Sequence, residues 1–351
     1  MTPPDVPSNG RRRRVRRWRR RADLKVILPI VITLGLVGYV ALLATGPRSG
    51  GQLWAIVRET WWSILLLTVP YIAARAILWH ELLEQLGIVV PWRPTLAALA
   101  GGEIAKTVPG GVYVQNYLLA RLANFGELPI VRSSTATTAA LGLESLLALP
   151  IALFIGIPNT PWLFWALIGI VVSWLALIVL LWLLVHTWEV HLAPGTPPWL
   201  RAGLRIGAEF LDAAKDLCTW RTVRALVPTA TYMLIYVADL YLIAGAVGIH
   251  DISFVQTMSI YAIVVLTVIL IPIPTKLGTT ELTGLTAFVA YGIPGPTAAI
   301  IMLGLRLMAS GATILLAAAL LLILRREFAT ASARGSQPGA APAGATPSDR
   351  P

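Results

Sequence analysis

A lysine beside a Pro/Gly break is the first feature of this chain that could do chemistry. Lys106 lies shortly before Pro109 and Gly110 in the segment KTVPGG, and Glu103 lies three residues before the lysine. A short helix that begins after such a break presents unpaired backbone N–H groups, which together with a lysine can hold an anion such as a phosphate. The alternative is a local ion pair between Glu103 and Lys106, because side chains at i and i+3 are neighbours on a helix.

The second half of the chain contains a similar combination. Lys276 follows Pro274 in the segment PIPTKLG, and Glu281 lies shortly after Gly278. The same reasoning predicts a second anion site here, with the alternative that the glycines only permit tight turns and close helix approach. The candidate substrate-binding residues of the two breaks are Lys106, Pro109, Gly110, Lys276, Gly278 and Glu281.

The spacing around the two breaks is also similar, which indicates an internal repeat. The interval from Pro109 to Gly142 is nearly the same as the interval from Pro272 to Gly304. Each of these glycines lies in a segment with one charge, namely Glu144 in LGLES and Arg306 in LGLRL. We expect these two charges to meet near the middle of the membrane, where opposite charges reduce each other's desolvation cost. Such an ion pair would be either a structural clasp or a gate that opens during transport.

Two further carboxylates are candidates for coupling to an ion. Asp239 lies in an apolar segment among Tyr232, Tyr236 and Tyr241, and Glu103 lies beside the first break. Ionisable side chains at membrane depth are costly and generally face the protein interior. Asp239 is therefore either a proton-coupling carboxylate or a hydrogen-bonded structural acid.

Composition predicts the fold class. With 56% hydrophobic and 13% charged residues, a soluble chain of 351 residues would leave large apolar surfaces in water. We predict an all-α polytopic membrane protein with about six full transmembrane helices, each near the ~20 residues that cross the hydrocarbon. Two broken, re-entrant helix pairs at 95–125 and 253–292 complete the expectation, although 253–272 is long enough to span. The six predicted spans are 26–45, 61–79, 133–156, 162–187, 225–248 and 297–324.

Charge sets the predicted orientation. The formal net charge is +11, and its largest contribution is the run from Arg11 to Arg21 before the first apolar segment. We interpret this run as a topology determinant that contacts anionic lipid headgroups, and we expect no nucleic-acid partner. The positive-inside rule then predicts a protein of the cell (plasma) membrane with both termini cytoplasmic. Counting the crossings makes the two repeats inverted, an arrangement typical of alternating-access transporters.

Five regions follow from these patterns. We predict a basic cytoplasmic arm at 1–25, a first transmembrane half at 26–187, and a cytoplasmic amphipathic linker at 188–224. A second transmembrane half at 225–325 and a disordered cytoplasmic tail at 326–351, rich in Pro, Ala, Gly and Ser, complete the chain. In the linker, Leu204, Ala208, Leu211 and Ala214 would share one helical face.

The two breaks carry a family resemblance. The segments PGGVYVQNYLLARL at 109–122 and PIPTKLGTTE at 272–281, with Arg306 downstream, resemble the flippase-like membrane domain of lysylphosphatidylglycerol synthases and their stand-alone relatives. The resemblance covers about 55–325. The first half departs from the family pattern, because Val112 to Gln115 stand where relatives place a Gly-Glu pair. The resemblance implies lipid movement, or a helper role in lipid-linked glycan assembly; it does not imply lysyl transfer.

Two classes of function remain open at this point. The first is a carrier that moves an anionic phospholipid or polyprenyl-linked lipid between leaflets, with Lys106 and Lys276 on the headgroup and Glu281, Glu144 and Arg306 at the gate. The second is an integral-membrane glycosyltransferase or accessory subunit, with lipid-modifying enzymes or glycosyltransferases as partners. The chain contains no DxD pair, and HTWEVH at 186–191 is its nearest approach to a metal motif. We expect membrane lipids as partners and no cofactor or metal.

Overall fold

The computed structural model describes residues 49–106, 111–123, 127–156, 198–270 and 278–327, with isolated positions between 165 and 183. Every regular element in these ranges is a helix, which confirms the predicted all-α polytopic membrane fold. The longer helices are α2 (Ser49–Gln85), α5 (Glu127–Phe154), α7 (Pro198–Asp216), α9 (Leu226–Ala246) and α10 (Phe254–Leu270). The shorter elements are α3 (Trp92–Ala105), η1 (Gly111–Tyr113), α4 (Val114–Ala123), α8 (Trp220–Arg224), α11 (Thr279–Ala290), α12 (Gly295–Leu305), η2 (Arg306–Ser310) and α13 (Gly311–Ile323).

Within the described residues, four helices are long and apolar enough to cross a membrane: Gly50–Gln85, Ile130–Phe154, Trp220–Ala246 and Gly295–Ile323. They contain or overlap the spans predicted at 61–79, 133–156, 225–248 and 297–324. Helix α2 is longer than expected: its 37 residues rise about 55 Å against a hydrocarbon core of about 30 Å. The spans predicted at 26–45 and 162–187 lie outside the described residues, apart from isolated positions in the latter.

Two helices are described in each region predicted as a broken pair. In the first, α3 packs against α4, and in the second, α10 packs against α11. The connecting residues 107–110 and 271–277 lie outside the described part of the chain. Helix α10 has 17 residues, which rise about 26 Å and fall slightly short of the full hydrocarbon thickness.

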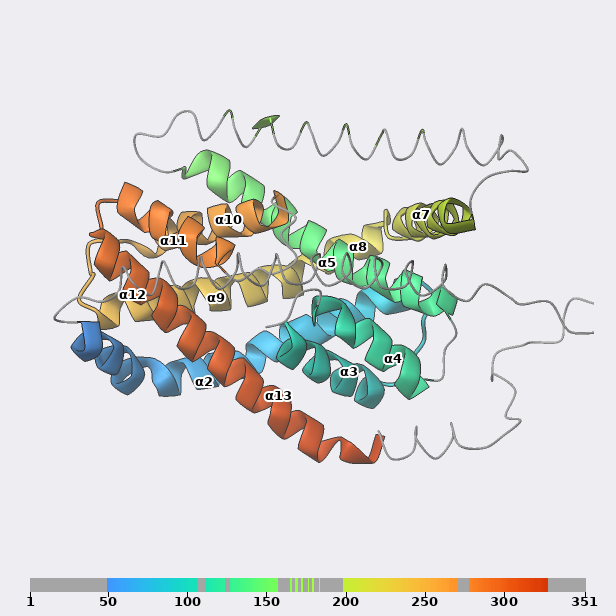
Figure 1. Ribbon diagram of the computed structural model, residues 1–351, viewed down its shortest axis with the longest axis horizontal. Helices are drawn as coiled ribbons and strands as arrows, with labels where there is room; N and C mark the ends of the chain where they lie inside the picture. Colours follow the sequence, from blue (N-terminus) through green and yellow to red (C-terminus); the bar gives the residue numbers. More distant parts are fainter. Residues whose placement is uncertain are drawn as a thin grey trace, which may run out of the picture.

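Helices α2 and α9 run antiparallel at the centre of the bundle (Figure 1). Three contacts along their length fix this direction. A side chain at Gly304 would meet both Ile56, near the start of α2, and Ile243, near the end of α9. The rings of Tyr71 and Tyr232 are 6.1 Å apart, and Thr222 donates to Gln85 Oε1 at 2.7 Å at the opposite end.

The remaining helices pack reciprocally around this central pair. Helix α5, which follows the first broken pair, packs on α10, and α13, which follows the second, packs on α3. The α3–α4 and α10–α11 pairs lie towards opposite ends of the long helices (Figure 1). Each half of the chain therefore rests on the short helices of the other half.

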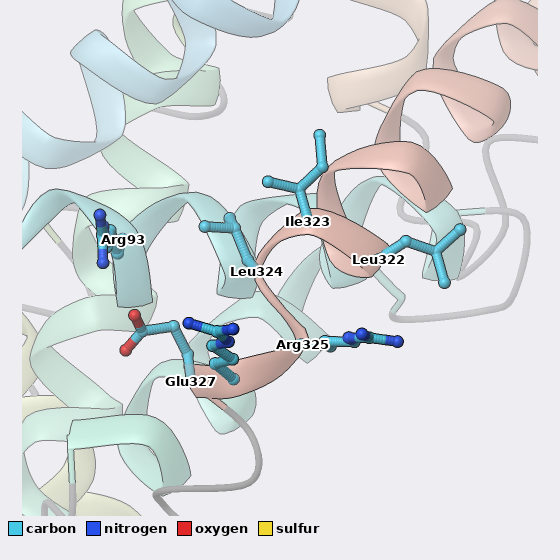
Figure 2. A pocket seen from close by; sticks show the side chains of 7 residues that line it. Arg93, Leu322, Ile323, Leu324, Arg325 and Glu327 are labelled. Atoms are coloured by element: carbon cyan, nitrogen blue, oxygen red, sulfur yellow. The ribbon is translucent and has the colours of Figure 1, made fainter.

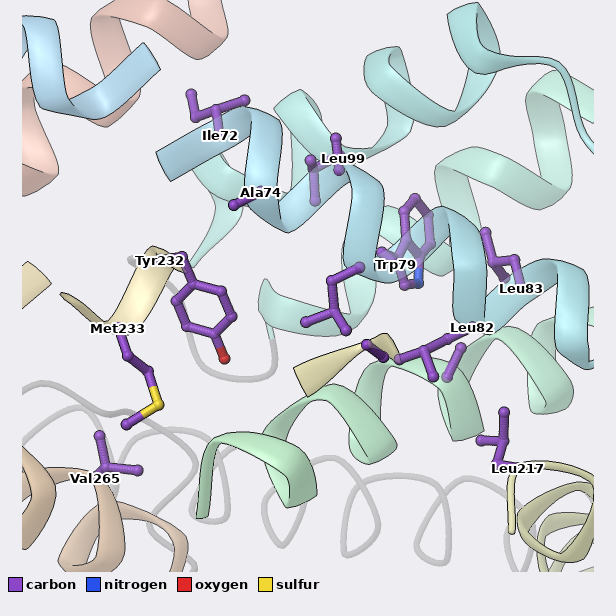
Figure 3. Packing of buried hydrophobic residues seen from close by; sticks show 14 of the residues in the cluster. Ile72, Ala74, Trp79, Leu82, Leu83, Leu99, Leu217, Tyr232, Met233 and Val265 are labelled. Carbon is purple, nitrogen blue, oxygen red and sulfur yellow. The ribbon is translucent and has the colours of Figure 1, made fainter. Parts of the chain in front are cut away.

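The apolar core is divided into two clusters. One gathers side chains of α2, α3, α5, α9 and α10, among them Leu82, Leu99 and Tyr232 (Figure 3). The other surrounds Phe288 and contains residues of α9, α11 and α12 together with the first part of α2. Tyr236 packs against both clusters, so its neighbourhood is where the two apolar regions meet.

Helix α7 has the amphipathic pattern predicted for the linker. The four predicted apolar positions are partly buried, whereas Arg201, Arg205, Asp212, Lys215 and Asp216 are exposed. Ala213 of α7 and Leu217 just after it are buried, and α7 packs against α5. Part of α7 is thus used for contact within the protein.

Close backbone approach explains the glycine at the first break. A Cβ atom on Gly111 would lie 1.6 Å from the carbonyl oxygen of Ala105, a distance that no side chain can occupy. A Cβ on Gly102 would lie 2.7 Å from Cβ of Gln115. At both positions the close approach of neighbouring atoms excludes a side chain.

Candidate functional site

The first break holds a buried carboxylate between two cations. Lys106 Nζ lies 2.6 Å from both carboxylate oxygens of Glu103, and Arg75 Nη1 of α2 lies 3.3 Å from Glu103 Oε1. The Glu103 side chain is 1% exposed. The local pair considered as an alternative from the sequence is therefore formed, and Arg75 is a third member that the sequence analysis did not select.

Tyrosines surround the guanidinium of Arg75. Its Nη1 donates to the hydroxyl of Tyr71 at 3.2 Å. Its Cζ lies 5.8 Å from the ring centre of Tyr71 and 5.6 Å from that of Tyr232. Such cation–π contacts are strongest where water is excluded, so Arg75 is held by one charge pair and two aromatic faces.

The tyrosine cluster continues to Glu144. The Tyr236 ring lies 6.4 Å from that of Tyr71 and 5.1 Å from that of Tyr261. Tyr261 donates its hydroxyl to Glu144 Oε1 at 2.7 Å. We refer to the set that runs from the first break to this carboxylate as the polar band: Tyr71, Arg75, Glu103, Glu144, Tyr232, Tyr236 and Tyr261.

The second break places a charge pair at the beginning of α11. Gly278 has φ 84 and ψ −46, a conformation that residues with a Cβ rarely adopt. Its backbone N–H donates to Glu281 Oε2 at 2.6 Å. The other carboxylate oxygen, Oε1, accepts from Arg306 Nε at 2.6 Å, so Glu281 joins the helix start to η2.

Arg306 retains donors beyond this pair. Its Nη2 is buried and has no hydrogen-bond partner in the described part of the protein, while its side chain as a whole is 31% exposed. Arg306 also begins a π-helical turn that ends at Ser310, an irregularity that is frequent at functional sites. The guanidinium can thus bind an additional acceptor without giving up Glu281.

The predicted ion pair between Glu144 and Arg306 is not formed. Arg306 pairs with Glu281, and Glu144 accepts from Tyr261 instead. The reason is geometric: the first-turn carboxylate of α11 reaches η2 directly, and α5 packs against α10. The sequence therefore selected both charged residues but assigned them the wrong partners.

Asp239 lies on α9 and is 4% exposed. Its Oδ1 has no hydrogen-bond partner within the described residues. The interval from Asp239 to Pro272 is nearly the same as the interval from Arg75 to Pro109. Arg75 of α2 and Asp239 of α9 thus carry opposite charges at nearly equal distances before the prolines of the two breaks.

After each break, polar side chains join the short helix to a following element. In the first repeat, Gln115 Nε2 donates to the Thr137 hydroxyl at 3.0 Å, and that hydroxyl donates to Asn116 Oδ1 at 3.0 Å. These bonds join α4 to α5, as the Glu281–Arg306 pair joins α11 to η2. The link is uncharged in the first repeat and charged in the second.

Three of the predicted binding residues, Pro109, Gly110 and Lys276, lie outside the described residues. Among the residues that are described, no group of three or more His, Cys, Asp and Glu side chains is placed to hold a metal ion. The motif at 186–191 is outside that part.

Comparison with known proteins gives one family. Neither the curated proteins nor the solved structures provide a match. The family model described as "Lysylphosphatidylglycerol synthase TM region" matches residues 26–318, which include every helix discussed above except the end of α13 and the residues beyond it. The chain belongs to this family of membrane domains, and its function is accordingly related to membrane lipids.

Proposed function

We propose that this protein moves an anionic amphiphilic lipid, a phospholipid or a polyprenyl-linked lipid, between the two leaflets. The observation that carries the proposal is the Glu281–Arg306 pair, because Arg306 keeps a buried Nη2 donor beside the start of a short helix. A guanidinium presents its donors in a fork that matches the oxygens of a phosphate. The start of α11 adds the partial positive charge of a helix N-terminus.

The two repeats supply the means of movement. In this proposal they are inverted, and each re-entrant pair opens towards one leaflet, as in carriers whose halves rock around a midplane site. The reciprocal packing of α5 on α10 and of α13 on α3 supports this arrangement. The proposed path for the headgroup runs along the polar band, between Arg306 at one break and the Arg75–Glu103–Lys106 group at the other.

The lysines and carboxylates have distinct roles in the proposal. Lys106 and Lys276 contribute positive charge to the headgroup site together with Pro109, Gly110 and Gly278 of the breaks. Glu281 keeps its bond to Arg306 Nε and orients the guanidinium while Nη2 takes the phosphate. Glu281, Glu144 and Arg306 together form the gate. Asp239 binds the coupling proton. We place the protein in the cell membrane with both termini in the cytoplasm.

The test is leaflet exchange in proteoliposomes that contain the purified full-length protein. A fluorescent phosphatidylglycerol reports exchange through quenching of its outer-leaflet fraction, and the matching phosphatidylcholine controls for headgroup charge. We expect faster exchange of the anionic lipid than in protein-free vesicles. R306K keeps the charge that Glu281 needs but loses the fork of donors, and it should slow exchange about tenfold, as loss of about 1.4 kcal/mol would.

R221K on α8 is the matched control, because Arg221 is exposed and lies outside the polar band. It should exchange lipid at the wild-type rate. Equal rates in protein-containing and protein-free vesicles, for both phosphatidylglycerol and a polyprenyl phosphate, would reject the carrier and favour the enzyme or accessory role.

A further inference from the structure

A second cationic feature lies where α13 ends beside the beginning of α3. A cavity of about 500 Å³ is lined by Arg93 of α3 and by residues 322–327 (Figure 2). Helix α13 packs on α3, and this contact brings together residues that are far apart in the chain. The cavity shares no lining residue with the polar band or with the Glu281–Arg306 pair.

The position of the cavity corresponds to the headgroup layer of a bilayer. It lies at the end of the apolar span Gly295–Ile323. Trp92, the neighbour of Arg93, is 45% exposed and stacks on His80 with ring centres 3.8 Å apart. Tryptophans concentrate at membrane–water interfaces, so both the end of the span and Trp92 indicate the same depth.

The lining is cationic at one end and apolar at the other. Arg93, Arg325 and Arg326 outnumber the single acid Glu327. Within the described residues, neither Arg93 nor Arg325 has a carboxylate within salt-bridge distance. Leu322 and Ile323 are 70% and 75% exposed, which is the exposure expected of side chains that face acyl chains.

We propose that this cavity binds an anionic phospholipid of the surrounding bilayer. The cationic lining, which includes Arg93 and Arg325, attracts the phosphate, and an acyl chain lies along Leu322 and Ile323. A zwitterionic headgroup carries its own cation and gains less from the arginines. Because the ligand bridges α3 and α13, it stabilises the contact between the two halves. This binding does not depend on lipid translocation.

The experiment measures thermal unfolding of the full-length protein in detergent with short-chain lipids. Dioctanoyl phosphatidylglycerol should raise the Tm more than dioctanoyl phosphatidylcholine does, because a ligand of the folded state stabilises it by mass action. R93Q/R325Q should lose at least half of that increase. R221Q/R224Q removes the same charge from exposed positions of α8 near the same end of the bundle and should keep it.

Three outcomes would overturn the proposal. They are an equal Tm increase with both lipids, an equal loss in both double variants, and a full increase with glycerol phosphate alone, which would mean that a free phosphate suffices. Arg93 and Arg325 are exposed, so the double variant should fold; R325Q alone, at a helix end, should show a partial loss. The experiment measures the Tm increase on lipid binding, so its result does not depend on whether the protein exchanges lipid between leaflets.

Discussion

Tyr261 donates its hydroxyl to Glu144 across 2.7 Å and 117 positions of sequence, and this bond joins α10 of one half to α5 of the other. Tyr261 is 7% exposed, so water cannot readily replace the hydroxyl. A buried acceptor that loses its donor costs about 1–3 kcal/mol. The bond is therefore a defined link between the halves that mutagenesis can remove.

We expect Y261F to lower the free energy of unfolding by about 1–3 kcal/mol, because Glu144 loses the hydroxyl that donates to its Oε1. The measurement is chemical or thermal unfolding in detergent. Y261F/E144L removes both polar groups and should recover part of the loss. If the double variant is as unstable as the sum of the single ones, the two side chains do not interact.

R75M should be among the most destabilising substitutions in α2. It leaves Glu103, whose side chain is 1% exposed, with one cation fewer, and breaking a buried pair costs about 3–5 kcal/mol. R58M removes an arginine of the same helix whose side chain is 67% exposed and pairs with Glu59, a loss of about 0–1 kcal/mol. Thermal unfolding of both variants gives the comparison, and equal shifts would contradict the buried role of Arg75.

G278A should destabilise the second break. Its φ of 84 costs a residue with a Cβ about 1–2 kcal/mol, and the backbone N–H that it places on Glu281 would shift. G142A is the matched control, since a Cβ there meets nothing within 4 Å and alanine favours a helix. We expect a lower Tm for G278A and an unchanged or higher Tm for G142A. Equal Tm values for G278A and wild type would show that alanine adopts this conformation freely.

D239N separates stability from coupling. Asp239 is 4% exposed and its Oδ1 has no partner among the described residues, so removing its charge should leave the Tm unchanged or raise it. In proteoliposomes, a proton gradient should accelerate lipid exchange by the wild type and leave D239N unaffected. A gradient response that persists in D239N would assign the coupling to another group.

The sequence predicted most charges of the site and, as one alternative, the local Glu103–Lys106 pair, but not the partners that come from other helices. Pro and Gly in apolar segments mark interruptions directly, which is why the helix pairs were found. Pairing depends on which helix faces meet, and this is why Glu144 was matched with Arg306 rather than with Tyr261. The same comparison of intervals that selected Glu144 and Arg306 could also have identified Arg75. Arg75 lies nearly as far before Pro109 as Asp239 lies before Pro272.

Helix α5 of the first half packs on α10 of the second, and α13 of the second half packs on α3 of the first. Each half is therefore held in place by the other. In the proposed carrier, a displacement of one short-helix pair would therefore also move the long helix of the other half that packs on it, so that the two ends of the bundle would move together. Two fragments divided within the connection before α7 would each need the other to complete its fold.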